Sequence, residues 1–249
     1  MTDYLLNKKV KLNQPVNSFR TGLDTVLLAM VAPKIKSGNI CDMGAGVGAL
    51  GLCYLTRLVN NNIDVDKINI TGVEKSEVFT QYYSKNIDCN KFKNNFNIIN
   101  NDIVKTDLKK ASFDMVITNP PFEKNNAYKS DNDLKNIANI ESTCDLQSWI
   151  KTAVNITKQN GYIAIVHKME RLDEILHYLH PSIGAIRILP IITKVGFQPK
   201  RVIVVGVKNS KSSLKMHNPL ILSDDEKQYT DFTNKILFGE MEIDLYKKD

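Results

Sequence analysis

Short apolar runs alternate with segments of helical periodicity along most of the chain. The apolar runs are four to seven residues long and are bounded by Gly, Pro or Asn, which is typical of buried strands. The predicted strands cover residues 40–43, 68–73, 96–99, 113–118, 162–166, 186–192 and 201–207. The predicted helices cover residues 24–31, 49–59, 77–87, 146–157 and 172–179. A glycine turn is expected ahead of the strand at 162–166.

Alternation of strands and helices predicts a doubly wound, mostly parallel sheet. No helix-length segment separates the last two strands, so we expect them to be antiparallel. The fold class is therefore α/β, Rossmann-like, with a seven-stranded sheet and an antiparallel closing strand. We expect one domain in three parts. The N-terminal segment at 1–37 contains a helix that packs on the edge of the sheet or over the ligand site, the core spans 38–223, and a C-terminal tail at 224–249 packs on or trails the core.

Composition and charge narrow the classes of protein. The chain has 249 residues, 43% hydrophobic and 24% charged, which excludes a disordered or fibrous protein. Four scattered cysteines without a CxxC pair indicate reduced thiols and no zinc site, so we expect no metal. No apolar run approaches ~18 residues and the start does not resemble a leader, so we expect a cytoplasmic protein without a membrane partner. We also expect it to be a monomer.

Positive charge is segregated along the chain. The formal net charge is +6, and no acid occurs between Glu174 and Asp224. This acid-free stretch carries seven basic residues, namely Arg187, Lys194, Lys200, Arg201, Lys208, Lys211 and Lys215. Such a stretch favours a polyanionic partner, and Lys194, Lys200 and Arg201 are the candidate contacts to RNA phosphates. A solvated lysine-rich face is the alternative.

A glycine-rich loop follows the first strand of the predicted core. Cys41-Asp42-Met43-Gly44-Ala45-Gly46-Val47-Gly48 joins that strand to the next helix. Glycines allow close approach of a ligand to the backbone and to the free N–H groups of the helix start. The Asp42 carboxylate would repel a pyrophosphate but would favour an ammonium group, such as that of a methionine moiety. Gly44, Gly46 and Gly48 are therefore candidate cofactor contacts, with a ligand-free tight turn as the alternative.

Acids also end the next two predicted strands. Glu74 ends one strand, where a carboxylate can accept hydrogen bonds from the two hydroxyls of a ribose, and Lys75 follows it. Asp102 comes just after the next strand and can accept from the exocyclic amine of an adenine, with Ile103 against the ring. Three acids at successive strand ends predict one ligand crevice, because ligands bind outside the carboxyl ends of such sheets.

The motif with the most specific chemistry is Asn119-Pro120-Pro121-Phe122, directly after the fourth strand. The prolines fix φ and lack N–H donors, which leaves the carbonyl oxygens outward. The Asn119 side-chain oxygen and the Pro120 carbonyl can then accept both hydrogens of a planar amino group, which localises the nitrogen lone pair. Phe122 offers a stacking face for a base, worth ~1–3 kcal/mol.

These motifs resemble those of class I S-adenosylmethionine-dependent amino-methyltransferases. Gln14-Pro15 and residues 19–29 are similar to the opening of the bacterial tRNA(Val) adenine-N6 methyltransferase family. Looser matches to that family lie at 138–141, 201–208, 218–220 and 229–230.

The resemblance implies S-adenosylmethionine as cofactor and N6-methylation of an adenine in tRNA, most simply nucleotide 37 beside the anticodon. It also implies that the segment containing Arg20, Thr21, Gly22 and Asp24 covers the methionine end of the cofactor. The chain departs from the family at Phe122, where Tyr is frequent, and at Ile140, where many members have His. The latter departure weakens any role for the helix that follows the Asn119 loop.

Other functions remain open from the sequence. Asn-Pro-Pro geometry can also orient a carboxamide, as in glutamine-N5 methylation of a peptide release factor. Against that reaction, the chain has no separate helical region of ~70 residues before the glycine loop. Against DNA adenine methylation, the sequence has no obvious target-recognition insertion. An RNA-binding protein without turnover would not need the complete motif set. A nicotinamide-dependent oxidoreductase would leave Asn119 to Phe122 unexplained.

Overall fold

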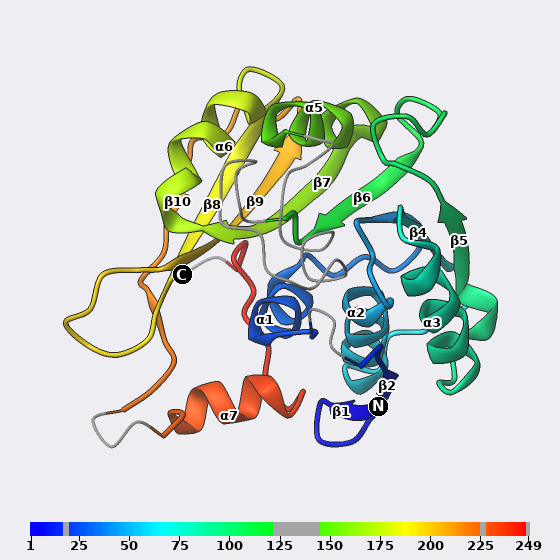
Figure 1. Cartoon of the computed structure of the whole chain (residues 1–249). Coiled ribbons are helices and arrows are strands. Elements are labelled where there is room, and N and C mark those ends of the chain that lie inside the picture. Colours follow the sequence, from blue (N-terminus) through cyan, green and yellow to red (C-terminus); the bar gives the residue numbers. More distant parts are fainter. Residues whose placement is uncertain (17–19, 122–144, 225–227, 248–249) are drawn as a thin grey trace.

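A central sheet with helices on both faces forms the molecule (Figure 1). The computed structural model describes residues 1–16, 20–121, 145–224 and 228–247. The helices are α1 Leu23–Val31, α2 Ala49–Asn60, α3 Glu77–Asp88, α5 Leu146–Ile156, α6 Leu172–Leu179 and α7 Asp231–Leu237, with short 3₁₀ turns at Lys93–Asn95 and Met169–Arg171. The strands are β1 Thr2–Leu5, β2 Val10–Asn13, β3 Gly38–Met43, β4 Ile68–Glu74, β5 Phe96–Asn100, β6 Phe113–Thr118, β7 Thr157–Lys168, β8 Ile183–Ile192, β9 Arg201–Lys208, β10 Lys215–Met216 and β11 Leu220–Ile221.

The strand order is β10-β8-β9-β7-β6-β3-β4-β5, and β11 also pairs with β8. Strands β3 to β7 are mutually parallel, whereas β9 is antiparallel to both β7 and β8. The predicted fold class is confirmed, with two refinements. The antiparallel strand lies inside the sheet, and the short strands β10 and β11 extend the seven predicted strands to nine.

One boundary prediction is wrong. The glycine turn expected before residue 162 does not interrupt the chain, because β7 runs through Gly161 from Thr157 to Lys168. The pairing register shifts there, between the partners of Phe113 and Met115. A Cβ at Gly161 would lie 2.9 Å from the Asp114 carbonyl oxygen. Gly161 therefore permits a close approach inside an irregular strand pair instead of a turn.

Alternating sheet residues separate two hydrophobic layers. Ile40, Met115 and Ile117 pack in one cluster with α1 and α2, and α7 packs against α1, whereas Cys41 and Val116 pack with α5 and α6. Figure 1 shows these two groups of helices on opposite sides of the sheet. This period-two alternation is what a sheet covered on both faces requires.

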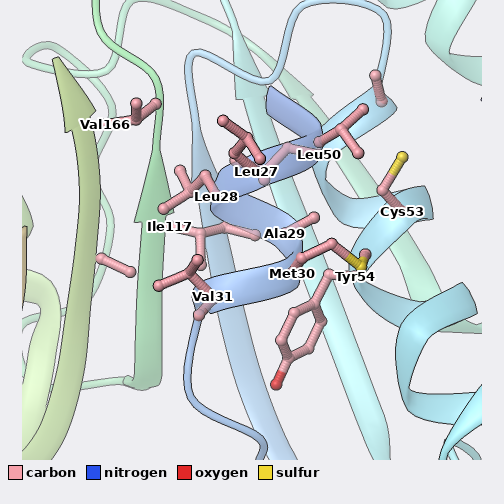
Figure 2. Close-up of a cluster of buried hydrophobic side chains, with 14 of the residues drawn as sticks. Leu27, Leu28, Ala29, Met30, Val31, Leu50, Cys53, Tyr54, Ile117 and Val166 are labelled. Carbon is pink, nitrogen blue, oxygen red and sulfur yellow. The ribbon is translucent and has the colours of Figure 1, made fainter. Parts of the chain in front are cut away.

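Helix α1 is deeply packed against the sheet and α2. All its residues from Thr25 to Val31 are buried. In Figure 2, Leu28 points toward Ile117 of β6, while Met30 lies beside Tyr54 of α2. The prediction that this helix packs on the edge of the sheet or over the site is refined, since it lies on the sheet face.

The N-terminal hairpin β1–β2 was not predicted from the sequence. Its backbone is attached to the core by Asn86 of α3, which is fully buried. The Asn13 N–H donates to Asn86 Oδ1 (2.6 Å), and Asn86 Nδ2 donates to the carbonyl oxygen of Val47 (2.9 Å). One buried amide thus fixes the hairpin against the glycine loop.

Candidate active site

The pairing register brings four strand ends to one line. Met43 of β3 is opposite both Val73 of β4 and Thr118 of β6, and Glu74 is opposite Asn100 of β5. Neighbouring strands lie ~4.8 Å apart. The glycine loop, Glu74, Asp102 and Asn119 therefore meet at the carboxyl edge of the sheet.

The glycine loop is tightly packed on two sides and open at its centre. Its three glycines all have positive φ, from 56° at Gly46 to 83° at Gly48. A Cβ at Gly48 would lie 2.1 Å from the ring of Tyr83, and one at Gly44 would lie 2.8 Å from Trp149. A Cβ at Gly46 would meet no described atom within 4 Å. The loop thus leaves space for a ligand at Gly46 while its flanks are fixed.

Asp42 lies in β3, buried beneath the start of α2. Its Oδ2 accepts a hydrogen bond from the Gly51 N–H at 3.2 Å. The pKa of Asp42 is raised to about 7, mainly because the carboxyl is buried; the Gly51 hydrogen bond opposes the shift, and the charge of Glu74 adds to it. An apoprotein carboxyl of this kind changes its charge near neutral pH.

Glu74 links the glycine loop to the start of α3. Its Oε2 accepts from the Gly46 N–H (2.9 Å) and its Oε1 accepts from the Ser76 N–H (2.8 Å). Burial raises the pKa of Glu74, and these backbone hydrogen bonds oppose the shift. A carboxylate held at both oxygens keeps a fixed orientation at the strand end, and each oxygen retains lone pairs for further donors.

Asp102 carries an unsatisfied oxygen. Its Oδ2 is buried and has no hydrogen-bond partner within the described part of the chain, although Lys75 Nζ lies 3.5 Å away as an ion pair. The next residue, Ile103, is buried in the hydrophobic layer beneath α5. Buried polar atoms are normally paired, so Asp102 Oδ2 is available to a donor from a ligand.

The side-chain amide of Asn119 has its nitrogen hydrogen-bonded and its oxygen free. Its Nδ2 donates to Thr25 Oγ1 of α1 at 3.2 Å. Its Oδ1 is buried and accepts from no described residue. The preceding residue, Thr118, is held by two further hydrogen bonds, to the Met43 carbonyl oxygen (2.8 Å) and from Trp149 Nε1 (2.9 Å). The free acceptor thus lies at a strand end whose position is set by three other elements.

The rest of the Asn-Pro-Pro-Phe motif is only partly described. Pro120 and Pro121 follow β6, and the backbone of Pro121 interacts with His167 of β7. Burial, and then the charge of Arg171, lower the pKa of His167 to about 4, so this imidazole is neutral at pH 7. Phe122, Ile140 and the segment 138–141 lie outside the described residues. The proposed role of the Pro120 carbonyl remains a prediction.

The segment at residues 20–24 lies between the N-terminal hairpin and α1. The Thr21 N–H donates to Gln14 Oε1 at 2.8 Å, and Arg20 contacts the sulfur of Met1. Gly22 precedes the first residue of α1, with open space around its Cα. The expected cofactor contacts of this segment remain predictions, while its anchoring to the hairpin is a structural fact.

Two residues predicted for different ligands contact one another. Asp24, predicted at the cofactor, forms an ion pair with Arg201, predicted at RNA, with Nε to Oδ2 at 2.9 Å. Both side chains remain partly exposed. Lys200 is exposed beside this pair, and Lys194 lies in the loop between β8 and β9. The structure therefore places Arg201, with Lys200 next to it in the chain, at the first turn of α1.

Sequence reasoning missed the contributions of Thr25 and Trp149 to this site. Thr25 is one residue from Asp24, and no motif marks it as different from any other helical threonine. On its helical stripe Trp149 resembles any other core residue, and it is indeed buried, but its indole also donates to Thr118. Only the folded chain shows that these residues support Asn119.

The described part of the chain contains no group of three or more His, Cys, Asp or Glu side chains arranged to hold a metal ion. None of the described helices is long and apolar enough to cross a bilayer.

Comparison with known proteins gives consistent likenesses. The sequence profile of the methyltransferase small domain family matches residues 20–188. A tRNA1(Val) (adenine(37)-N6)-methyltransferase of Haemophilus influenzae is 27% identical over 243 residues, covering 97% of each chain. The Porphyromonas gingivalis protein of the same name is 24% identical over 211 residues, covering 81% of this chain and 80% of its own.

Solved structures agree at the level of the fold. A predicted O-methyltransferase from Agrobacterium tumefaciens has a TM-score of 0.71 and 21% identity, covering 90% of this chain and all of its own. A putative class I S-adenosylmethionine-dependent methyltransferase from Listeria monocytogenes has a TM-score of 0.55 and 16% identity, covering 87% of this chain and 68% of its own. Both likenesses concern the arrangement of the sheet and its helices.

Proposed function

This chain belongs to the methyltransferase small domain family, and from that premise we propose that it methylates N6 of an adenine in tRNA, at nucleotide 37. Two relatives that cover at least four-fifths of the chain carry that activity in their names. The observation that supports the proposal most is the buried, unpartnered Oδ1 of Asn119 at the carboxyl edge of the sheet. A planar amino group needs such an acceptor.

The residues at this edge fit S-adenosylmethionine, the cofactor expected from the sequence. Asp102 Oδ2 has no hydrogen-bond donor among the described residues. The exocyclic amine of the cofactor's adenine would supply one. Glu74 is fixed at the next strand end, where ribose hydroxyls can reach its remaining lone pairs. Asp42 carries a carboxyl that an ammonium group would stabilise in its charged form. When bound, the sulfonium supplies an activated methyl group.

The chain's own residues then have one main task, to orient the target nitrogen. Asn119 Oδ1 accepts one N–H of the adenine amine, and the Pro120 carbonyl is proposed to accept the other. Both bonds localise the lone pair on nitrogen and aim it toward the cofactor. The base must leave its stack to reach this point, as single-stranded loops allow. Holding the nitrogen in line with the methyl group adds the advantage of proximity and orientation.

The direct test is incubation of the protein with methyl-labelled cofactor and either total tRNA or a peptide release factor. We expect label in tRNA, recovered as N6-methyladenosine after digestion to nucleosides and mass spectrometry. Label in a glutamine of the release factor, with none in tRNA, would instead establish the alternative amide substrate. Absence of label in both would contradict the proposal.

We expect Thr25→Val to lower kcat about ten- to hundredfold, because loss of the acceptor for Asn119 Nδ2 lets the amide turn and misplaces Oδ1. Thr25→Ser keeps the hydroxyl and should retain most of the activity. Cofactor affinity should stay near the wild-type value in both variants. Equal kcat for the Val and Ser variants would show that Thr25 does not position Asn119.

We expect cofactor affinity to fall as the pH decreases through 7. Asp42 has a raised pKa, so it gains a proton in this range and loses its attraction for the ammonium group. The dissociation constant of S-adenosylhomocysteine, measured by calorimetry, should rise by up to about tenfold per pH unit below 7. Asp42→Asn should flatten this dependence between pH 6 and 8. Glu74, Cys41 and Tyr83 are the ionisable groups coupled to Asp42.

The raised pKa of Asp42 also makes the folding stability of the apoprotein depend on pH. Because the folded state holds the Asp42 proton more tightly than the unfolded state, stability of the apoprotein should decrease as the pH rises from about 4 to 7. Asp42→Asn removes this contribution, so urea unfolding of the two proteins at pH 5 and 8 checks it. A wild-type pH profile unchanged in the variant would contradict the assignment.

A further inference from the structure

A pocket of about 700 Å³ lies beyond β8, on the side of the sheet far from β5. It is formed by β8, the loop after it, the segment around β11, α7 and the C-terminal segment. Figure 1 shows β8, β10 and α7 at this side of the molecule. Its volume is within the range of small-molecule and base-binding sites, ~300–1,000 Å³. None of the residues proposed at the cofactor lines it.

Direct contacts connect this pocket to Asn119. The amide of Asn119 bonds to Thr25, and the neighbouring Asp24 pairs with Arg201 at 2.9 Å. Arg201 is opposite Ile191 of β8. Ile191 is in turn opposite Leu220, a residue of the pocket wall. Only two strand spacings separate Arg201 from the pocket wall, ~10 Å.

The wall is mostly apolar, with one exposed aromatic ring, one lysine and one carboxylate. Nine of the fourteen lining residues belong to the acid-free stretch between Glu174 and Asp224; Lys194 is the basic residue among them, and Asp224 also lines the pocket. Phe232 of α7 and Val195 are wall residues that are 43% and 68% exposed, respectively. An aromatic ring and a lysine in one pocket can hold a nucleotide, since a base stacks on the ring and the lysine attracts a phosphate.

One polar group of the wall lacks a partner. His217 donates its backbone N–H to the Ile188 carbonyl oxygen (2.8 Å). Its Nε2 is buried, and no described residue bonds to it. A hydrogen bond from the edge of a base would satisfy this nitrogen.

We propose that this pocket binds an unstacked nucleotide of the substrate RNA that flanks the target adenine, with its base on Phe232 and its edge toward His217. The proposal rests on the proposed function. When the target base is splayed toward Asn119, its neighbours lose a stacking partner as well. A second base site would fix the strand on the far side of the Asp24–Arg201 pair and select the sequence beside the target.

The first test uses kinetics of full-length protein with total tRNA as substrate. Phe232→Ala should raise KM for tRNA about five- to tenfold, as loss of one stacked base predicts, and leave S-adenosylhomocysteine affinity unchanged. Phe238→Ala is the matched control, because Phe238 is 44% exposed on the same helical segment but does not line the pocket. Val195→Asp should also raise KM, through repulsion of phosphate, whereas Val59→Asp, on an exposed position at the end of α2, should not.

The second test is photocrosslinking of tRNA transcribed with 4-thiouridine, followed by peptide mass spectrometry. Crosslinks to residues 217–232 that disappear with Phe232→Ala are the expected result. The pocket proposal is overturned if the wild-type protein methylates tRNA, KM is unchanged in Phe232→Ala and Val195→Asp, and no crosslink forms in the wall. That result would leave the proposed function intact. If wild-type protein methylates no tRNA, the proposed function fails, and absence of wall crosslinks would then overturn the pocket proposal separately.

Discussion

Replacing Asn119 by Ala is expected to reduce methyl transfer at least about a thousandfold, comparable to removal of a key polar group that acts in a transition state. The free Oδ1 is the only side-chain acceptor that the described part of the chain places, buried and unpartnered, at the end of β6. Without it the target amine keeps its lone pair delocalised into the ring. Single-turnover transfer of labelled methyl to tRNA measures the effect.

Controls separate chemistry from binding in this experiment. Cofactor affinity of Asn119→Ala should remain within about tenfold of wild type, because Glu74 and Asp102 are untouched. Asn39→Ala changes an exposed asparagine at the opposite edge of the sheet and should leave turnover unchanged. Wild-type turnover in Asn119→Ala would refute the role of the amide.

Replacing Arg57 by Met is expected to cost about 3–5 kcal/mol of folding free energy, the usual effect of breaking a buried ion pair. The Arg57 side chain of α2 is 2% exposed and its Nε lies 2.7 Å from Glu242 Oε2. Its Nη1 also donates to the Ala29 and Ala32 carbonyl oxygens at the end of α1. Its loss leaves Glu242 Oε2 and two carbonyl oxygens at the end of α1 without this donor, while Lys34 still pairs with Glu242 Oε1. The melting temperature should fall by ~10 °C in a chain of this size.

A double variant tests the pairing. Arg57→Met with Glu242→Leu also removes the carboxylate that lost its buried donor and should recover part of the lost stability, which a double-mutant cycle quantifies. Lys235→Met provides the control, because its ion pair with Asp231 is exposed and should contribute little. Strictly additive single effects would show that Arg57 and Glu242 are not coupled.

The Asp24–Arg201 ion pair changes the expectation for both residues. Sequence reasoning treated Asp24 as a cofactor contact and Arg201 as an RNA contact. In the folded chain their charges offset one another at the first turn of α1, next to Thr25 and Asn119. A phosphate that approached Arg201 would have to compete with Asp24, so the RNA contact predicted for Arg201 would be coupled to the first turn of α1.

By itself the sequence determined most of the helices and strands and which side chains stand at the strand ends. Helices and strands such as 77–87 and 113–118 were predicted to within one or two residues, because hydrophobic periodicity and flanking Gly or Pro act over a few neighbouring residues. The acids at the ends of β4 and β5 and the Asn119 motif follow from the same local patterns. These features specify a Rossmann-like methyltransferase.

The tertiary structure alone decided how distant side chains satisfy one another. The Asn119–Thr25 hydrogen bond spans 94 residues, Arg201–Asp24 spans 177 and Arg57–Glu242 spans 185. No local pattern encodes such pairs, because the strand order and the seating of α1 on the sheet face bring the partners together. The same packing leaves Asn119 Oδ1 free, since Thr25 occupies only the other end of the amide.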